Sequence, residues 1–298
     1  MTKTVLITGS SGYFGGIACR YFADRGWKVI KASRSEHADI AINLDHPEVF
    51  ANTKVDTQID LCIHAAAAHE VTCAKEPYRS IYHNVAGTRA VLDFCVNNEI
   101  SRFVYLSTFH VFGNPSGEIN ELTLPNPLND YGLTHLQAEQ YVKLYSSKFG
   151  LNGMVIRPSN FFGIPADLSR FERWSLIPFA FCKEAIETGS IVLKTPGYQK
   201  RNFVAVNDIC AAILGATKLE NMPDVLHVHG RDTVSVRELA TIVKTVVEKK
   251  GIRTVTILAP DGPLTTDNFI FNSLYLSTIS NPSETLMDYV EGFIEVVR

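Results

Sequence analysis

The glycine-rich N-terminal stretch restricts the fold of this chain more than any other part of its sequence. A run of branched apolar residues at 5–7 predicts a short buried strand, because turn-forming residues follow it directly. Gly9, Gly12 and Gly15 come next, and an apolar stripe at 17–22 predicts a helix behind them. This order directs the free N–H groups of a helix start at a phosphate, where the helix dipole also favours negative charge. The glycines permit positive φ and close approach of the backbone to a pyrophosphate.

Strand and helix patterns then alternate along the chain. Strands are predicted at 28–32, 39–44, 59–64, 102–107 and 153–157, and helices at 47–52, 80–97 and from 131 onward. This alternation predicts an α/β fold, a doubly wound parallel Rossmann sheet with right-handed crossovers. We assign residues 1–160 to this dinucleotide-binding domain. Residues 161–298 are expected to form mainly a smaller C-terminal α/β part that binds substrate and interleaves with the sheet domain.

The C-terminal part carries fewer signals. An element like a β-hairpin, beginning at residue 191, is expected to carry Arg201. The stretch at 267–280 is polar and predicts irregular structure. Three helices are expected here, at 177–187, from 206 onward and at 233–249. The candidate N-caps are Asn207 or Asp208 for the second and Thr233 or Ser235 for the third.

Composition restricts the partners and the compartment. The net charge of −3 indicates neither a nucleic-acid partner nor an anionic membrane surface. No stretch approaches the roughly 18 apolar residues that span a bilayer, and no signal pattern precedes the first strand. No C-x-x-C pair occurs, and we expect a reduced cytoplasmic protein rather than a disulfide or zinc framework. The six cysteines are scattered: Cys19, Cys62, Cys73, Cys95, Cys182 and Cys210.

The predicted strand ends converge on one site, because ligands of doubly wound sheets bind beyond the carboxyl ends of the strands. The second strand ends at Ser33 and Arg34, where an NAD-binding unit usually carries a carboxylate for the ribose 2′-hydroxyl. A guanidinium pairs instead with a 2′-phosphate. The sequence therefore favours NADP, with NAD as the alternative.

Seven motifs follow one another in a recognisable order. They are Thr-Gly-x-x-Gly-x-x-Gly at 8–15, His-Ala-Ala-Ala at 64–67, Asn-Val-x-Gly-Thr at 84–88, Ser-Thr-x-x-Val-Phe-Gly at 107–113, Tyr-Gly followed by Glu at 131–139, Arg-Pro-x-Asn-x-x-Gly at 157–163 and Arg-Asn-Phe-Val-x-Val-x-Asp at 201–208. The chain resembles an extended short-chain dehydrogenase/reductase of the NAD-dependent epimerase/dehydratase family that modifies nucleotide sugars.

This resemblance implies roles for individual residues. Thr108 would hydrogen-bond the reacting oxygen of the substrate, Tyr131 would transfer the proton, and Asn84 would support the active-site water and the helix geometry. The residues that would hold or line the cofactor are Gly9, Ser11, Gly12, Tyr13, Phe14, Gly15, Ala65, Ala66, Ala67, Ser107, Tyr131, His135 and Pro158, with Ser33 and Arg34 at the ribose. The residues that would contact the substrate are Thr108, His110, Asn160 and Arg201.

Position 135 departs from the family pattern Tyr-x-x-x-Lys, because it holds histidine. The family's lysine lowers the tyrosine pKa and hydrogen-bonds the nicotinamide ribose. Histidine can still bond the ribose, but its reference pKa of about 6.5 leaves it mostly neutral at pH 7. Three interpretations follow: His135 replaces the lysine, the enzyme is slow, or the site binds a cofactor without turnover.

The sequence thus predicts an NAD(P)-dependent oxidoreductase or epimerase that acts on a sugar, with hydride transfer and Tyr131 as proton donor or acceptor. The alternatives are a catalytically degenerate NADP-binding regulator or scaffold of the same fold, and a reductase of a non-nucleotide carbonyl compound. Phe109 and His110 stand where a dehydratase typically has Asp-Glu, which argues against dehydration. The H-x-H pair His227 and His229 has no accompanying carboxylate spacing, so we predict no metal. A homodimer is expected from the resemblance.

Overall fold

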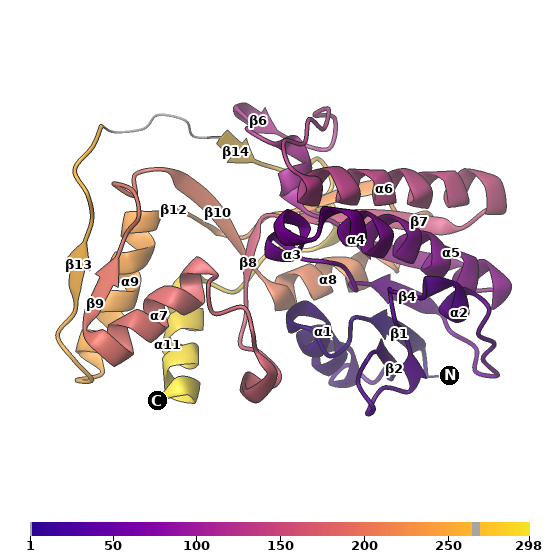
Figure 1. The fold of residues 1–298 in the computed structure, drawn as a ribbon, viewed down its shortest axis with the longest axis horizontal. Helices are drawn as coiled ribbons and strands as arrows, with labels where there is room; N and C mark the ends of the chain where they lie inside the picture. The colour runs from indigo at the N-terminus through magenta and orange to yellow at the C-terminus, as the bar shows by residue number, and fades with distance from the viewer. Residues whose placement is uncertain (1, 264–268) are drawn as a thin grey trace.

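Seven parallel strands form the main sheet of the computed structural model, which describes residues 2–263 and 269–298. The strands lie in the order β11-β7-β5-β4-β1-β2-β3 (Figure 1). Their bounds are β1 Thr4–Thr8, β2 Lys28–Ser33, β3 Ile40–Ala41, β4 Leu61–His64, β5 Arg102–Leu106, β7 Asn152–Pro158 and β11 Val225–Val228. Because β11 comes from the C-terminal half, this half contributes to the sheet as well. The predicted doubly wound α/β fold is confirmed.

Helices cover both faces of this sheet, and the period of two along each strand explains why. Within β5, Phe103 packs with the helices of one face and Val104 with those of the other, and both side chains are fully buried. The first face carries α2 Pro47–Ala51, α5 Gly87–Asn97 and α6 Asp130–Phe149, and the second carries α1 Tyr13–Ala23, α8 Val206–Ala216 and α10 Leu276–Ile279.

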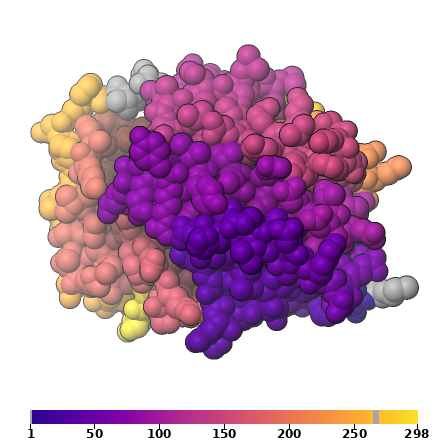
Figure 2. All heavy atoms as spheres, turned by 45° about the vertical axis from the view of Figure 1, so that its right-hand side comes forward, coloured from indigo at the N-terminus to yellow at the C-terminus, as the bar shows by residue number. Residues whose placement is uncertain are grey.

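The second part has its own apolar core, built from α7, α9 and α11 against short strands. It lies beside the sheet domain, joined to it through β8 and β10 (Figure 1), and the large salmon, orange and yellow region at the left of Figure 2 belongs to the C-terminal half of the chain. The elements are β8 Asn160–Phe162, α7 Ile177–Thr188, β9 Ser190–Val192, β10 Lys200–Ala205, β12 Asp232–Ser235, α9 Val236–Lys249, β13 Thr256–Leu258 and α11 Leu286–Val297. A separate pair, β6 Gly117–Ile119 and β14 Phe269–Phe271, lies at the edge between the parts.

The expected hairpin at residue 191 is wrong. β9 pairs in parallel with β13, whereas β10, which carries Arg201, pairs with β8 and β12. Ile191 is fully buried in the core of the second part, so long-range packing rather than a local turn decides the partner of β9. The expected irregular stretch is also wrong from residue 269 on, since β14 and α10 form there; residues 267 and 268 lie outside the described part of the chain.

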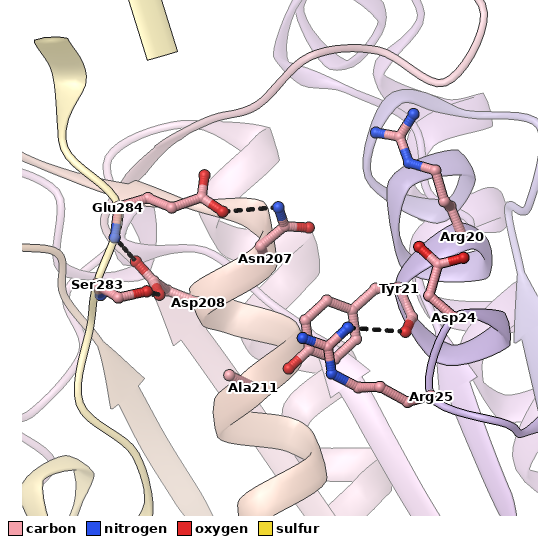
Figure 3. Close-up of a pocket in the computed structure, with 9 residues that line it drawn as sticks. All are labelled: Arg20, Tyr21, Asp24, Arg25, Asn207, Asp208, Ala211, Ser283 and Glu284. Carbon is pink, nitrogen blue, oxygen red and sulfur yellow. Dashed lines mark hydrogen bonds between the residues drawn. The ribbon is translucent and has the colours of Figure 1, made fainter. Parts of the chain in front are cut away.

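The predicted cap of α8 is wrong, whereas one predicted cap of α9 is confirmed. Ala205 is the N-cap of α8, and Asn207 and Asp208 lie in its first turn. Asp208 accepts hydrogen bonds from the backbone and hydroxyl of Ser283, both at 3.0 Å, and Asn207 donates to Glu284 at 2.7 Å (Figure 3). These side chains attach the C-terminal segment to α8 instead of capping the helix.

The N-terminus of α9 follows the sequence expectation more closely. Ser235 is the N-cap, and it forms a capping box with Glu238. The other candidate, Thr233, lies in β12. Each helix within residues 2–263 and 269–298 is too short or too polar to cross a bilayer.

Candidate active site

The glycine-rich turn forms a tightly closed cradle at the start of α1. Gly9 has a φ of +68°, and the Gly12 N–H donates to its carbonyl at 2.9 Å. A Cβ on Gly15 would lie 2.1 Å from the Gly9 oxygen, and a Cβ on Gly9 would lie 2.9 Å from the Ala65 oxygen. No side chain caps α1, and its first turn holds no acidic residue, so the positive helix end is not neutralised. The turn therefore fits the pyrophosphate of a dinucleotide.

The register of the sheet brings the other expected cofactor residues to the same edge. Thr8 is level with His64, which is level with Tyr105 in the next strand. The residues that follow these strand ends consequently lie side by side, and they include Ala65, Ala66 and Ala67 after β4 and Ser107 after β5. Pro158 is the last residue of β7, and Ser11, Tyr13 and Phe14 belong to the turn and the first turn of α1.

An exposed cation, Arg34, follows the end of β2. Ser33 is buried, and its hydroxyl accepts from the Ser35 N–H at 3.1 Å. Arg34 is exposed, and among the described residues nothing forms an ion pair or a hydrogen bond with its guanidinium. Arg34 is therefore available to an anion at the ribose end of the cradle.

Two hydroxyl groups meet where β5 ends and α6 begins. Thr108 is the N-cap of a 3₁₀ turn, and its Oγ1 accepts from the His110 N–H at 3.2 Å. Gly132 permits close packing here, because a Cβ at this position would lie 2.4 Å from the His110 oxygen. Burial raises the pKa of Tyr131, while a hydrogen bond with Thr108 and the charge of Arg173 oppose that rise. The Tyr131 phenol therefore remains protonated at neutral pH.

Tyr131 lies edge-on between two imidazoles. Its ring centroid is 4.6 Å from that of His135 and 5.6 Å from that of His110, both in T-shaped contacts. His135 is 3 % exposed, and burial lowers its pKa to about 3. At pH 7 this imidazole is neutral, so it cannot supply the positive charge of the family's lysine. Its Nδ1 and the Tyr105 hydroxyl share a hydrogen bond of 2.7 Å.

Asn84 occupies a π-helical turn that the sequence did not reveal. The expected helix at 80–97 consists of α4 Pro77–Ile81, the π turn Tyr82–Ala86 and α5. The Asn84 amide accepts from the Ala68 N–H at 2.7 Å and donates to the Thr134 hydroxyl at 2.9 Å. It thereby ties the loop after β4 to α6, beside Tyr131. A π turn often marks a functional site.

A buried ion pair that the sequence analysis missed stands behind the site. Glu139 and Arg157 are 4 % and 5 % exposed along their side chains, and their bidentate contact has N–O distances of 2.9 and 2.5 Å. The Ser107 hydroxyl donates to the same carboxylate at 2.5 Å. The pair therefore joins α6, β5 and β7, three elements that carry the site. Both residues belong to motifs of the resemblance, which was the available signal.

The expected substrate residues come together from both parts of the chain. Burial lowers the pKa of the His110 imidazole. The negative charge of Glu70 raises this pKa, and the positive charge of Arg201, on β10, lowers it. The charge of Glu70 also raises the pKa of Tyr131, and the charge of Arg173 lowers it. Asn160 is partly occupied, because its amide donates to the Asn202 carbonyl at 3.2 Å. Sequence reasoning missed Glu70 and Arg173, which lie in segments that only the tertiary structure brings to Tyr131.

His227 is part of the core between β11 and β14. Its Nδ1 contacts the Asn272 carbonyl at 3.1 Å, and its ring stacks on Phe271 at 4.7 Å. Within residues 2–263 and 269–298, no three His, Cys, Asp or Glu side chains are grouped so that they could hold a metal ion.

Fold and site together define a Rossmann-type protein built to hold a nicotinamide dinucleotide. The NAD dependent epimerase/dehydratase family matches residues 5–228, and the chain belongs to that family. It is 26 % identical over 260 residues to a putative UDP-glucose 4-epimerase of Methanocaldococcus jannaschii, with 83 % of each chain covered.

Two solved structures share this fold across nearly the whole chain. The UDP-glucose 4-epimerase of Thermotoga maritima with UDP-glucose has a TM-score of 0.81 at 19 % identity, covering 99 % of this chain and 98 % of its own. RMD of Pseudomonas aeruginosa with NADPH has a TM-score of 0.82 at 20 % identity, covering 99 % and 97 %.

Proposed function

We propose that this protein is an NADP(H)-dependent oxidoreductase or epimerase that acts on a nucleotide-diphosphate sugar, with Tyr131 as proton donor or acceptor. One observation carries the proposal: the glycine cradle and the Tyr131–Thr108 pair lie at the same carboxyl edge of the sheet. Ligands of doubly wound sheets bind at that edge. Relatives described as UDP-glucose 4-epimerase and dTDP-4-dehydro-6-deoxy-D-allose reductase support a sugar nucleotide as substrate, and they leave both reaction types open.

The choice of NADP over NAD rests on Arg34. Its guanidinium is exposed at the end of β2 and pairs with no group in residues 2–263 and 269–298, and the preceding residue, Ser33, carries no carboxylate. A 2′-phosphate can pair bidentately with such a group, whereas a carboxylate at this position would repel it. Related folds hold NAD in one case and NADPH in another.

The residues around Tyr131 favour proton donation at neutral pH. A dinucleotide bound in the cradle would supply or accept the hydride. Tyr131 stays a phenol because burial raises its pKa, so it can donate its proton to a carbonyl oxygen that Thr108 also hydrogen-bonds. The neutral His135 can orient the ribose of the cofactor, but it cannot lower the pKa of Tyr131. Asn84 holds α6 in place. The reverse direction, which needs the tyrosinate, is expected to be slower.

The substrate end depends on charge from the second part of the chain. Arg201 lies near His110 and suits a diphosphate. Asn160 on β8 and Arg201 on β10 come from paired strands of one sheet, which places them together. A non-nucleotide carbonyl substrate would leave Arg201 without a function in the site.

A catalytically degenerate NADP-binding regulator is the second candidate, and the neutral His135 favours it. The test compares wild type with His135→Lys, following NADPH and NADH oxidation against a panel of keto-sugar nucleotides and simple ketones. Turnover of a nucleotide sugar by wild type supports the enzyme. If both proteins are inert while NADP still binds, the regulator is correct; turnover of simple ketones alone identifies a reductase of non-nucleotide compounds.

We also propose a homodimer in a reducing, cytoplasmic compartment. Leu133 and Leu144 lie exposed on α6, with 44 % and 49 % of their surface accessible, and would be covered by a second copy. All six cysteines are free and buried. Light scattering on the purified protein tests the dimer, and Leu144→Asp should shift it to monomer.

A further inference from the structure

His135 has one nitrogen engaged and one without a partner. Its Nδ1 lies 2.7 Å from the Tyr105 hydroxyl, whereas its Nε2 is buried and has no hydrogen-bond partner in the described part of the chain. A buried polar atom left unpaired destabilises a folded protein, because it has lost its hydrogen bonds to water without replacement. Such an atom therefore indicates a ligand that would form the missing hydrogen bond.

A second buried histidine, His64, lies on the other side of Tyr105, and both of its ring nitrogens form hydrogen bonds within the protein. The Thr8 hydroxyl accepts from the Ala65 and Ala66 N–H groups, so it donates its own hydrogen to His64 Nδ1 at 2.6 Å. His64 Nε2 then donates to the Thr88 hydroxyl at 3.1 Å. Both nitrogens of His64 are satisfied within the protein.

Because His64 already has its own partners, the Tyr105 hydroxyl is free to hydrogen-bond His135. Its ring lies between the two imidazoles, with centroids 5.6 Å from His64 and 5.7 Å from His135. The Thr88 oxygen beside it already accepts from His64, and its hydrogen goes to the Asn84 carbonyl at 2.6 Å. Burial raises the pKa of Tyr105, so the side chain is a phenol with a hydrogen to donate. His135 Nδ1, at 2.7 Å, is the acceptor that the hydrogen-bond geometry gives this hydroxyl, and the Thr88 hydroxyl is a further neighbour that lowers the pKa of Tyr105.

We propose that Tyr105 is a positioning residue: its hydroxyl donates to Nδ1 of His135, fixes the imidazole as the Nε2–H tautomer, and holds that N–H for a ribose hydroxyl of the bound dinucleotide. The last step rests on the proposed function, because it needs the dinucleotide in the cradle. His135 lies one helical turn after Tyr131 and contacts its ring. A neutral N–H donor in this position orients the cofactor without lowering the tyrosine pKa.

The experiment reads the tautomer and the affinity separately. Long-range ¹H–¹⁵N spectra of the ¹⁵N-labelled free protein distinguish protonated from unprotonated ring nitrogens, and the His135→Phe spectrum assigns the signals. Tyr105→Phe removes the hydroxyl and keeps the ring. Tyr145→Phe is the matched control, since it removes another buried phenol hydroxyl, bonded to Asp93 at 2.5 Å. NADPH affinity is measured for each by calorimetry.

We expect His135 in wild type as Nε2–H, a loss of that single tautomer in Tyr105→Phe, and NADPH binding weakened about three- to tenfold. Tyr145→Phe should change neither, and the His64 signals should stay constant throughout. In a His135→Phe background, Tyr105→Phe should have no further effect on affinity, which a merely structural role would not produce.

Three results overturn the proposal. They are a His135 that carries its proton on Nδ1 in wild type, an unchanged tautomer in Tyr105→Phe, and an affinity for NADPH that Tyr105→Phe does not alter. Failure of wild type to bind any dinucleotide overturns the proposed function and the ribose contact together. This last result remains distinguishable, because the tautomer is read in the free protein.

Discussion

A methyl group added at Gly15 would collide with the backbone of the turn before it. The new Cβ would lie 2.1 Å from the Gly9 oxygen and 2.7 Å from its carbonyl carbon. Real Cβ contacts with backbone essentially never fall below 3.0 Å, so the Gly9 peptide must move by about 1 Å. Overpacking of this kind costs about 1–3 kcal/mol. Because the displaced peptide belongs to the cradle, NADPH affinity should fall by roughly tenfold or more.

Gly16→Ala provides the matched control. Gly16 lies next to Gly15 in α1, so both substitutions carry the same gain of about 1 kcal/mol from helix propensity. The Cβ at Gly16 would meet the Ala166 Cβ at 3.2 Å and the Ser10 oxygen at 3.7 Å, an ordinary van der Waals distance. Calorimetric titration with NADPH and urea unfolding of both variants separate binding from stability. If Gly15→Ala binds NADPH as tightly as Gly16→Ala, the turn is not a phosphate cradle.

The remaining predictions concern acid stability, catalysis and cofactor choice. Burial lowers the pKa of His64 and His135 to about 3 and that of His227 to about 4, so the unfolded chain binds up to three more protons below its histidine pKa of about 6.5. The free energy of unfolding should therefore fall as pH falls, by up to about 4 kcal/mol per pH unit between about pH 5.5 and 4.5; urea melts across this range should show it, and a flat profile would contradict the burial. Tyr131→Phe should reduce turnover by about 10²–10⁴-fold with NADPH affinity unchanged, as kinetics and calorimetry can check; undiminished turnover would exclude this residue as the proton donor. Arg34→Ala should weaken NADPH binding by roughly 10- to 100-fold and leave NADH binding unchanged, whereas an equal loss for both cofactors would contradict a 2′-phosphate contact.

The sheet domain could be predicted from sequence because its signals are local. The apolar run before Gly9 and the glycine spacing require only a strand, a turn and a helix to be placed correctly. The same holds for the strand ends, whose side-by-side arrangement follows from parallel pairing. The capping box of Ser235 and Glu238 is likewise written within four residues.

Features that depend on tertiary packing could not be predicted from the sequence. Aspartate is a common helix N-cap, yet Asp208 accepts hydrogen bonds from the backbone N–H groups of Ser283 and Glu284, which lie 75 or more positions away. β9 pairs with β13, and β10, α8, β11, β12 and α9 all lie between these two strands in the sequence. At the site, His135 is neutral because burial and the neighbouring His110 lower its pKa, and the charge of Arg173 near Tyr131 depends on how the two parts pack. No local pattern carries such information.

Native mass spectrometry of the protein purified without denaturation tests the central claim most directly. We expect one NADP(H) per chain, or its uptake on addition, together with a nucleotide-diphosphate sugar retained from the cell or bound from a mixture. Gly15→Ala should lose the dinucleotide, while Gly16→Ala should keep it. A wild-type protein that retains neither a dinucleotide nor a nucleotide sugar, even with both supplied in excess, would contradict the account.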